Sequence, residues 1–298
     1  MRTAFIQQLI KEARNNKNIF LLVGDLGFSV VEPFAKEFPD RYINVGIAEQ
    51  NMAGIAGGLA LNGYIVYCYS IGNFPTLRCI EQIRNDIAYY HSNVRIVAVG
   101  AGYAYGSQGM SHHATEDIAM MRAIPEMAVC SPSDPYEAQA ITTLSVNYQG
   151  PMYIRLGKAG EKVIHSCPIE NYKIGDLLTI SANNNSTAVI TSGSIADSVI
   201  NSIKNKQLAY DIYTIPTIKP INTKQLNLLA NQYNRIITIE EHQKSAGIGS
   251  AIIEVLSDSY NSGLIKVFPK IERIAINDFF LSIVGDQNYL RKMANITI

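Results

Sequence analysis

Glu49 is the residue of this sequence whose surroundings most need a chemical explanation. It lies in the stretch RYINVGIAEQNMAGIAGGLALNG, residues 41–63, and from Ile47 to Leu61 its neighbours are almost all apolar or small. Such a composition predicts a helix buried on all sides, where an unpaired charge is costly. The carboxylate is therefore either a structural acid near the helix start, where the helix dipole favours negative charge, or a catalytic group whose pKa is tuned by burial.

Two adjacent histidines, His112 and His113, are the second candidate for chemistry. They follow the segment 100–111, whose glycines indicate a flexible loop that a ligand can approach closely. The loop lacks the GxGxxG spacing of a dinucleotide site, and no helix opens directly after it. We interpret one histidine as poised for proton transfer rather than the pair as a metal site.

Two segments around these residues carry a family resemblance. VGIAEQNMAGIAGGLA, residues 45–60, and SHHATEDIAMMRAIPEM, residues 111–127, resemble the pyrimidine-binding domain of transketolases and related enzymes that use thiamine diphosphate. The resemblance implies that Glu49 hydrogen-bonds N1′ of the aminopyrimidine and so activates the cofactor. It also implies that His112 contacts the donor sugar and helps to move its protons. In such enzymes the cofactor does the difficult chemistry and the protein orients it.

Three more positions take roles through the same resemblance. Phe74, in the loop after a predicted strand, supports the pyrimidine ring, and Asp25, in the GDLG turn, helps to order the cofactor site. Arg155 stands where the family often binds a substrate phosphate, a role that suits a guanidinium.

Three positions depart from the family pattern. His113 replaces a Gln, Gln108 replaces an acid that reads the donor's hydroxyl groups, and Gly100 replaces a His that contacts the acceptor phosphate in ordinary transketolases. We keep Gln108 and His113 as substrate-binding candidates. Losing one anionic and one cationic contact makes standard pentose phosphates doubtful and favours a non-standard sugar, such as an unusual or nucleotide-linked one.

The scaffold that must position these residues is predicted to be α/β, with two open, mainly parallel sheets flanked by helices. We expect a pyrimidine-binding domain over residues 1–165, a linker over 166–180 and a transketolase C-terminal domain over 181–298. Asp25 lies in the turn after strand 19–23 and Phe74 in the loop after strand 64–69, at the carboxyl ends of strands, where open α/β sheets bind ligands. The predicted strands are 19–23, 64–69, 94–99, 127–130, 150–156, 187–191, 209–214 and 235–240.

The composition limits the possible partners. The chain has 298 residues, zero net charge and no basic block, which argues against nucleic acid. It has no apolar run of about 18 residues, which argues against a membrane span, and residues 1–16 predict an amphipathic helix rather than a signal peptide. Cys68 and Cys130 fall in apolar runs, so we expect buried free thiols in a cytoplasmic protein.

The diphosphate end of the cofactor has no matching motif in this chain. The family holds it through Mg²⁺ and a GDG…N motif, whereas this chain offers only GDLG, GDLL and GDQN, without the oxygen ligands that Mg²⁺ needs. The resemblance covers nearly the whole chain but only the C-terminal half of a complete transketolase. We therefore expect one subunit of a split transketolase of carbohydrate metabolism. Its partner, the N-terminal transketolase subunit, would hold the diphosphate and Mg²⁺, in a heterotetramer with two copies of each.

Other functions stay open at this point. The β subunit of a 2-oxoacid dehydrogenase and a deoxyxylulose-phosphate-synthase-like subunit share the architecture and act on pyruvate. A non-catalytic scaffold is the alternative from another class. The presence of Glu49 and His112 favours an enzyme, and the SHH and MRAIPEM segments favour transfer of a two-carbon ketol unit between sugars.

Overall fold

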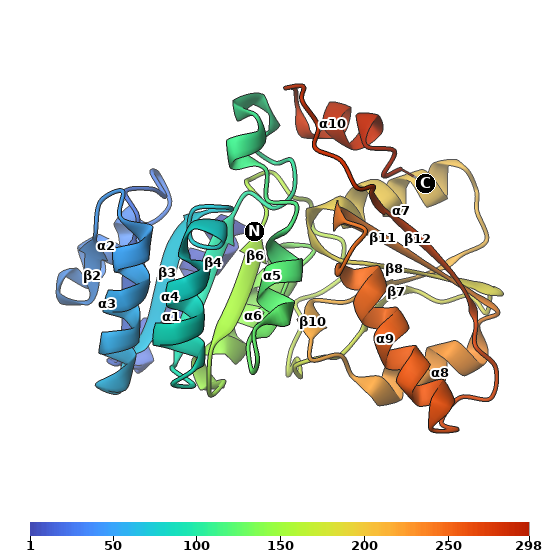
Figure 1. Cartoon of the computed structure of the whole chain (residues 1–298), viewed down its shortest axis with the longest axis horizontal. Coiled ribbons are helices and arrows are strands. Elements are labelled where there is room, and N and C mark those ends of the chain that lie inside the picture. The colour runs from blue at the N-terminus through green and yellow to red at the C-terminus, as the bar shows by residue number, and fades with distance from the viewer. Residues whose placement is uncertain (298) are drawn as a thin grey trace.

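The computed structural model describes residues 1–297, which form two sheets lying side by side (Figure 1). In the first sheet, the six strands that lie before residue 157 all run parallel, and a seventh, β10 (Thr217–Lys219), pairs antiparallel with β5 (Ala128–Cys130) at one edge. The first sheet has the spatial order β10 (Thr217–Lys219), β5 (Ala128–Cys130), β6 (Met152–Leu156), β4 (Val94–Val99), β3 (Ile65–Ile71), β1 (Ile19–Val23) and β2 (Tyr42–Asn44).

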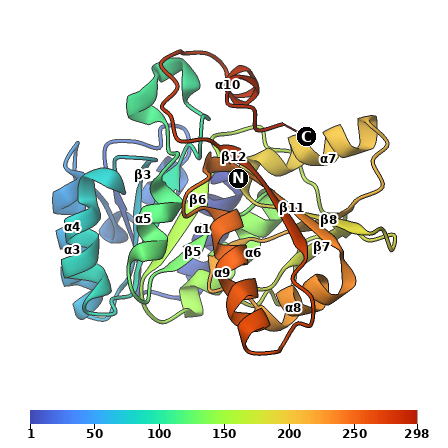
Figure 2. The same ribbon diagram turned by 45° about the vertical axis from the view of Figure 1, so that its right-hand side comes forward.

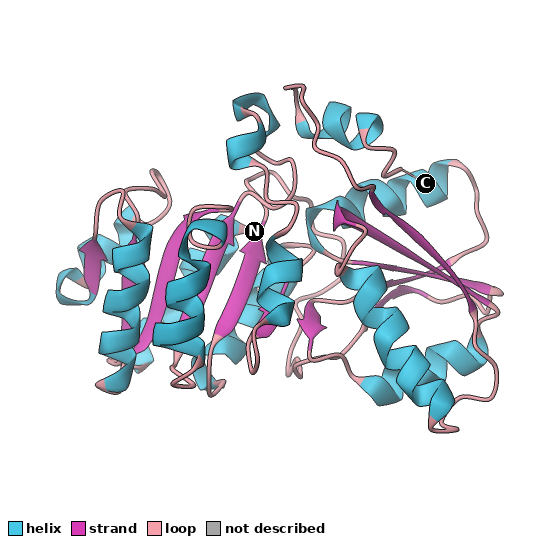
Figure 3. Cartoon of the chain, viewed as in Figure 1, coloured by secondary structure: helices cyan, strands magenta, loops and turns pink. Residues whose placement is uncertain are grey.

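The second sheet is parallel except for β7 (Leu178–Ser181), which pairs antiparallel with β9 (Asp211–Thr214) at one edge. Its spatial order is β12 (Lys270–Ile276), β11 (Arg235–Gln243), β8 (Thr187–Thr191), β9 (Asp211–Thr214) and β7 (Leu178–Ser181). Central strands such as β1 and β8 are buried along their whole length, because helices cover both faces of each sheet (Figure 3).

The helices divide between these faces. On the first sheet, α1 (Arg2–Asn15) and α6 (Pro135–Asn147) pack on one face, and α3 (Glu49–Leu61) and α5 (Asp117–Ala123) pack on the other. A short α4 (Ile80–Gln82) runs on into a π-helix, Ile83–Ala88, beside α3. The remaining helices are α2 (Glu32–Glu37) in the β1–β2 connection, and α7 (Ala196–Asn205), α8 (Thr223–Gln232), α9 (Ile248–Asn261) and α10 (Gln287–Met293) around the second sheet.

One hydrophobic cluster runs through both sheets. It includes Met52 of α3 and Met121 of α5 on the first sheet, and Leu226 of α8 and Ile252 of α9 on the second. The two halves of the chain therefore share apolar core, and β10 adds backbone pairing between them. The shared core and this pairing hold the two halves of the chain together.

The fold class predicted from the sequence is confirmed, and each predicted strand is present. The prediction that the Glu49 helix is buried on all sides is wrong for this chain alone. α3 buries one face, with Glu49, Met52 and Ala56, whereas Ile47 just before it is 79% exposed and Leu61 at its end is 64% exposed. Within the described residues, the helices are too short or too polar to cross a membrane.

Candidate active site

Glu49 stands at the first position of α3, at the carboxyl edge of the first sheet, and is only 1% exposed. Its Oε2 accepts a hydrogen bond from Arg78 Nη1 at 2.6 Å, and its Oε1 accepts one from Ser70 Oγ at 3.4 Å. Gly24, directly after β1, leaves room for the carboxylate, since a Cβ at Gly24 would lie 3.3 Å from Glu49 Cγ. The carboxylate is thus buried, paired and enclosed by the ends of β1 and β3.

Arg78 is a site residue that the sequence did not single out. Its guanidinium carbon lies 4.7 Å from the centre of the Phe74 ring, and its side chain is 44% exposed. It follows Phe74 by four residues, in a turn of 3-10 helix, Leu77–Cys79. An arginine in the same loop as a candidate aromatic residue is the signal that could have indicated it. One face of the guanidinium covers Phe74 while its edge neutralises Glu49.

Phe74 also brings His112 into this group. The two rings meet edge to face, 5.2 Å between centres, and the Tyr105 ring lies 6.3 Å from His112 on another side. Nδ1 of His112 is 3.0 Å from Ser111 Oγ, and the histidine is half-buried. The structure therefore places Glu49, Phe74 and His112 in one contiguous cluster, although the sequence separates them by up to 63 positions (112 − 49).

A cavity of about 430 Å³ opens beside this cluster. His113 lines it and is 4% exposed, and its Nε2 has no hydrogen-bond partner among the described residues. Burial lowers the pKa of His113, although a backbone hydrogen bond at Gly106 acts in the opposite direction. His113 is therefore a neutral ring on the cavity wall, with a nitrogen available to a ligand. Other residues that line the cavity are Phe74, Arg78, Tyr103, Glu116 and Phe280.

Asp25 and Gln108 lie outside this cavity. Asp25 is exposed, has a positive φ of 55°, and exchanges hydrogen bonds with Asn44, which fixes the turn that holds Gly24 against Glu49. Gln108 is exposed at the end of a turn of 3-10 helix, Gly106–Gln108. Asp25 thus orders the turn beside Glu49, and Gln108 lines no part of the cavity.

Arg155 is enclosed in protein rather than open to a substrate. It is 3% exposed, and its Nε donates to Asp117 Oδ2 at 2.7 Å. Its Nη2 donates to the backbone carbonyls of Ala114 and Glu241. Because these contacts join the first sheet to β11, the placement indicates a structural ion pair, and we leave Arg155 out of the substrate site proposed below.

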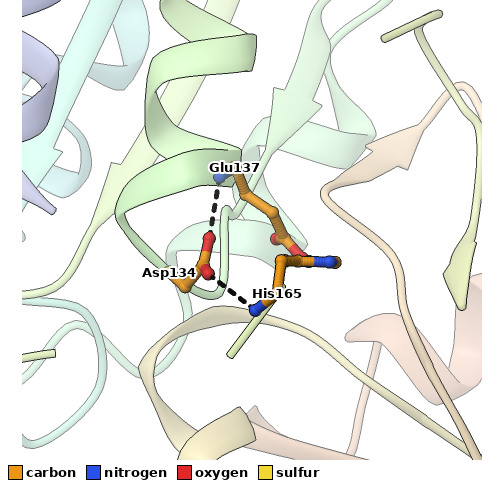
Figure 4. A group of neighbouring side chains, drawn as sticks. All are labelled: Asp134, Glu137 and His165. Atoms are coloured by element: carbon orange, nitrogen blue, oxygen red, sulfur yellow. Dashed lines mark hydrogen bonds and ion pairs between the residues drawn. The ribbon is translucent and has the colours of Figure 1, made fainter. Parts of the chain in front are cut away.

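One group of side chains has metal-ligand spacing, and it lies away from the cavity. Ligand atoms of Asp134, Glu137 and His165 all fall within 4.8 Å of one another (Figure 4). However, Asp134 accepts from the backbone N–H groups of Glu137 and Ile164, and Glu137 Oε1 accepts from His165 Nε2 at 2.8 Å. The cluster thus caps α6 and fastens the segment after β6 to it, so we assign it no metal.

Comparison with known proteins decides the family. The model of the transketolase pyrimidine binding domain matches residues 1–160, and that of the transketolase C-terminal domain matches residues 178–282. The chain belongs to the transketolase family. Among its transketolase relatives, a "putative transketolase C-terminal section" of Methanocaldococcus jannaschii is 36% identical, over 94% of this chain and 87% of the relative.

Two further relatives of this transketolase chain are informative. An apulose-4-phosphate transketolase subunit of Actinobacillus succinogenes is 29% identical, over 96% of this chain and 91% of the relative. A solved structure described as a split gene transketolase, an inactive β4 tetramer, superposes with a TM-score of 0.85 at 31% identity, over 99% of this chain and 93% of that one. The resemblance inferred from the two sequence motifs is thereby confirmed.

Proposed function

We propose that this chain is the pyrimidine-binding subunit of a split transketolase, which transfers a two-carbon ketol unit between sugars when it is assembled with a partner subunit. The observation that carries the proposal is the buried carboxylate of Glu49, held by Arg78 beside the aromatic ring of Phe74 at the edge of a sugar-sized cavity. Relatives named as transketolase subunits, which the chain matches almost end to end, support it.

The residues present fit the aminopyrimidine end of thiamine diphosphate. Glu49 offers a buried carboxylate to a ring nitrogen, Gly24 has no side chain to obstruct that approach, and Phe74 offers an aromatic contact. When bound, thiamine diphosphate supplies the carbon nucleophile of ketol transfer. Glu49 would hold the proton at the pyrimidine nitrogen, and His112 would move a proton at the donor's hydroxyl group. His113 would accept a hydrogen bond from the substrate.

The residues do not fit the diphosphate and its Mg²⁺. Within residues 1–297, the one group with metal-ligand spacing is the cap of α6, whose oxygens already accept hydrogen bonds from the protein. We assign the diphosphate and Mg²⁺ to the partner subunit, and propose a heterotetramer with two copies of each subunit. Two exposed apolar residues, Ile47 just before α3 and Leu61 at its end, supply surface for such an interface.

The substrate is proposed to be a non-standard sugar. Support comes from His113, which lines the cavity at a position where the resemblance expects a Gln, from Gln108 at a position where it expects an acid, and from a relative named for apulose 4-phosphate. A reaction on pyruvate is the alternative function, and an assay must distinguish it from ketol transfer between sugars.

Calorimetric titration of thiamine diphosphate and Mg²⁺ tests the split site directly. We expect tight binding to the mixture of this chain with its partner and none to this chain alone. Tight binding to the chain alone would contradict the assignment of the diphosphate to the partner. With the loaded complex, turnover of a ketose or hydroxypyruvate supports ketol transfer, whereas turnover of pyruvate alone, or full activity of a Glu49→Ala complex, would refute it.

A further inference from the structure

The segment between β12 and α10, residues 277–286, crosses from the second sheet back to the glycine-rich loop of the first (Figure 2). Gly285 N donates to the carbonyl of Gly106 at 3.4 Å. The helix that follows is fixed by a buried ion pair, in which Arg291 Nη2 lies 2.6 Å from Glu241 Oε2. The segment is therefore held against the candidate active site by contacts of its own.

Phe279 and Phe280, on this segment, stand between two cavities. The first is the cavity of about 430 Å³ that His113 lines. The second has about 310 Å³ and lies next to it. Glu116, Phe279 and Phe280 line both cavities, so the two cavities adjoin at the aromatic pair.

The second cavity has the chemistry of a site for hydroxyl groups. It is lined by two carboxylates, Glu116 and Asp278, by the amide of Gln243 and by the hydroxyl group of Ser245. No Lys, Arg or His is among the described residues that line it. Carboxylate and amide oxygens accept hydrogen bonds from hydroxyl groups, whereas two carboxylates repel a phosphate.

The first cavity also offers contacts for a sugar. Its buried His113 has an Nε2 without a partner among the described residues, and its Arg78 is already paired with Glu49. Phe280 is 69% exposed and Phe279 39% exposed, so both rings are available to the apolar face of a sugar. Aromatic side chains combine a large contact area with little conformational cost.

We propose that the second cavity is a subsite for the far end of a sugar substrate, that this end is hydroxyl-bearing and uncharged rather than phosphorylated, and that Phe279 and Phe280 support the sugar between the two cavities. The inference rests on the ketol transfer proposed above, which places the reacting end of the sugar in the first cavity near His112 and His113. It gives the second half of the chain a direct part in substrate selection.

The test uses the complex with the partner subunit and one matched pair of acceptors, D-ribose and D-ribose 5-phosphate. We expect the complex to prefer ribose, and Phe280→Ala to raise KM for ribose by about tenfold with kcat little changed, since one aromatic contact is worth about 1.4 kcal/mol. Phe280 is largely exposed, so its removal spares the fold. The control is Tyr260→Ala, which removes a half-exposed aromatic residue of α9 that lines neither cavity.

A second variant tests the charge of the subsite. Glu116→Gln combined with Asp278→Asn removes both carboxylates, and we expect it to improve binding of ribose 5-phosphate by about tenfold relative to ribose. A complex that prefers ribose 5-phosphate from the start, or whose binding of ribose is the same after Phe280→Ala, would overturn the inference.

Saturation-transfer NMR separates this inference from the proposed function, because it detects bound sugar without turnover. If the saturation of ribose by the complex weakens after Phe280→Ala, the result supports the subsite even if no ketol unit is transferred, and ketol transfer would then be the proposal that fails. Absence of saturation for both sugars would overturn the subsite.

Discussion

Arg78 and Glu49 form an ion pair beside the cavity of the candidate active site, with Nη1 and Oε2 2.6 Å apart. The carboxylate is 1% exposed and the arginine side chain 44% exposed, so one partner lies inside the protein and the other reaches solvent. The same guanidinium covers the face of Phe74. A pyrimidine ring that hydrogen-bonds to Glu49 and contacts Phe74 must therefore share these two residues with Arg78 or displace the Arg78 side chain.

The first prediction concerns the energy of this pair. Arg78→Met should lower the free energy of unfolding by about 1–3 kcal/mol, because it leaves a buried carboxylate without its charged partner. In a Glu49→Gln background, where the buried group is neutral, the same change should cost little. Denaturant unfolding of the two single variants and the double variant measures this coupling. Equal losses of unfolding free energy in both backgrounds would show that Arg78 stabilises the fold through its contact with Phe74 and not through Glu49.

The second prediction concerns activation of the cofactor. In the assembled complex, Glu49→Gln should slow exchange of the cofactor's C2 proton with deuterium by about 10²–10⁴-fold, the usual contribution of a positioned acid–base group. NMR after an acid quench follows this exchange directly. Glu81→Gln is the matched control, since Glu81 is an exposed acid on the neighbouring helical segment. Unchanged exchange in Glu49→Gln would remove Glu49 from the mechanism.

The sequence indicated Glu49, Phe74 and His112 as site residues through the resemblance to transketolases, and the structure brings the three side chains together through Arg78. Parallel strands deliver their carboxyl ends to one edge of a sheet, which explains why residues from loops after different strands meet there. The strands themselves followed from local patterns, since apolar runs such as 19–23 report burial directly.

The remaining features depend on contacts that no local pattern records. Arg155 looked like a free cation at a strand end, and only the fold shows Asp117 2.7 Å from it. β10 is three residues long and pairs with a strand almost ninety positions earlier (217 − 130 = 87). Phe279 and Phe280 reach the cavity through a segment whose path is fixed by α10. Such long-range pairings are decided by packing, not by composition.

The third prediction concerns the close packing of α3. A Cβ at Gly57 would lie 2.5 Å from the backbone oxygen of Asp86, whereas a Cβ at Gly58 meets no atom within 4 Å. Gly57→Ala should therefore destabilise the chain by about 1–3 kcal/mol through overpacking. Gly58→Ala should stabilise it by up to about 1 kcal/mol, because alanine favours a helix. Thermal unfolding of the chain alone compares the two, and equal effects would contradict the close approach of α3 to the 83–88 segment.

The fourth prediction separates the two histidines. His112→Ala should lower kcat of the complex by about 10²-fold or more, as expected for loss of a proton-transfer group. His113→Ala should mainly raise KM for the sugar, because His113 is a neutral group on the cavity wall. Steady-state kinetics of both variants decide the matter. The opposite pattern, in which His113→Ala lowers kcat, would assign the catalytic role to His113.

The fifth prediction concerns His165, which fastens the segment after β6 to α6 (Figure 4). Burial alone would lower its pKa, but the hydrogen bond and the charge of Glu137 outweigh burial and raise the pKa. A group whose pKa is raised by folding stabilises the folded state fully below its unfolded pKa, about 6.5, and loses that contribution as the pH rises through the folded pKa.

The free energy of unfolding of the wild type should therefore fall relative to that of His165→Gln as the pH rises above about 6.5. The quantity to compare is the difference in free energy of unfolding between the two proteins. Burial also lowers the pKa of His242 to about 4, so in both proteins the free energy of unfolding falls as the pH drops below about 6.5. Denaturant unfolding at a series of pH values supplies the two curves. A constant difference would mean that His165 is bound to Glu137 as a neutral ring, and that the attachment of the segment after β6 to α6 does not depend on its charge.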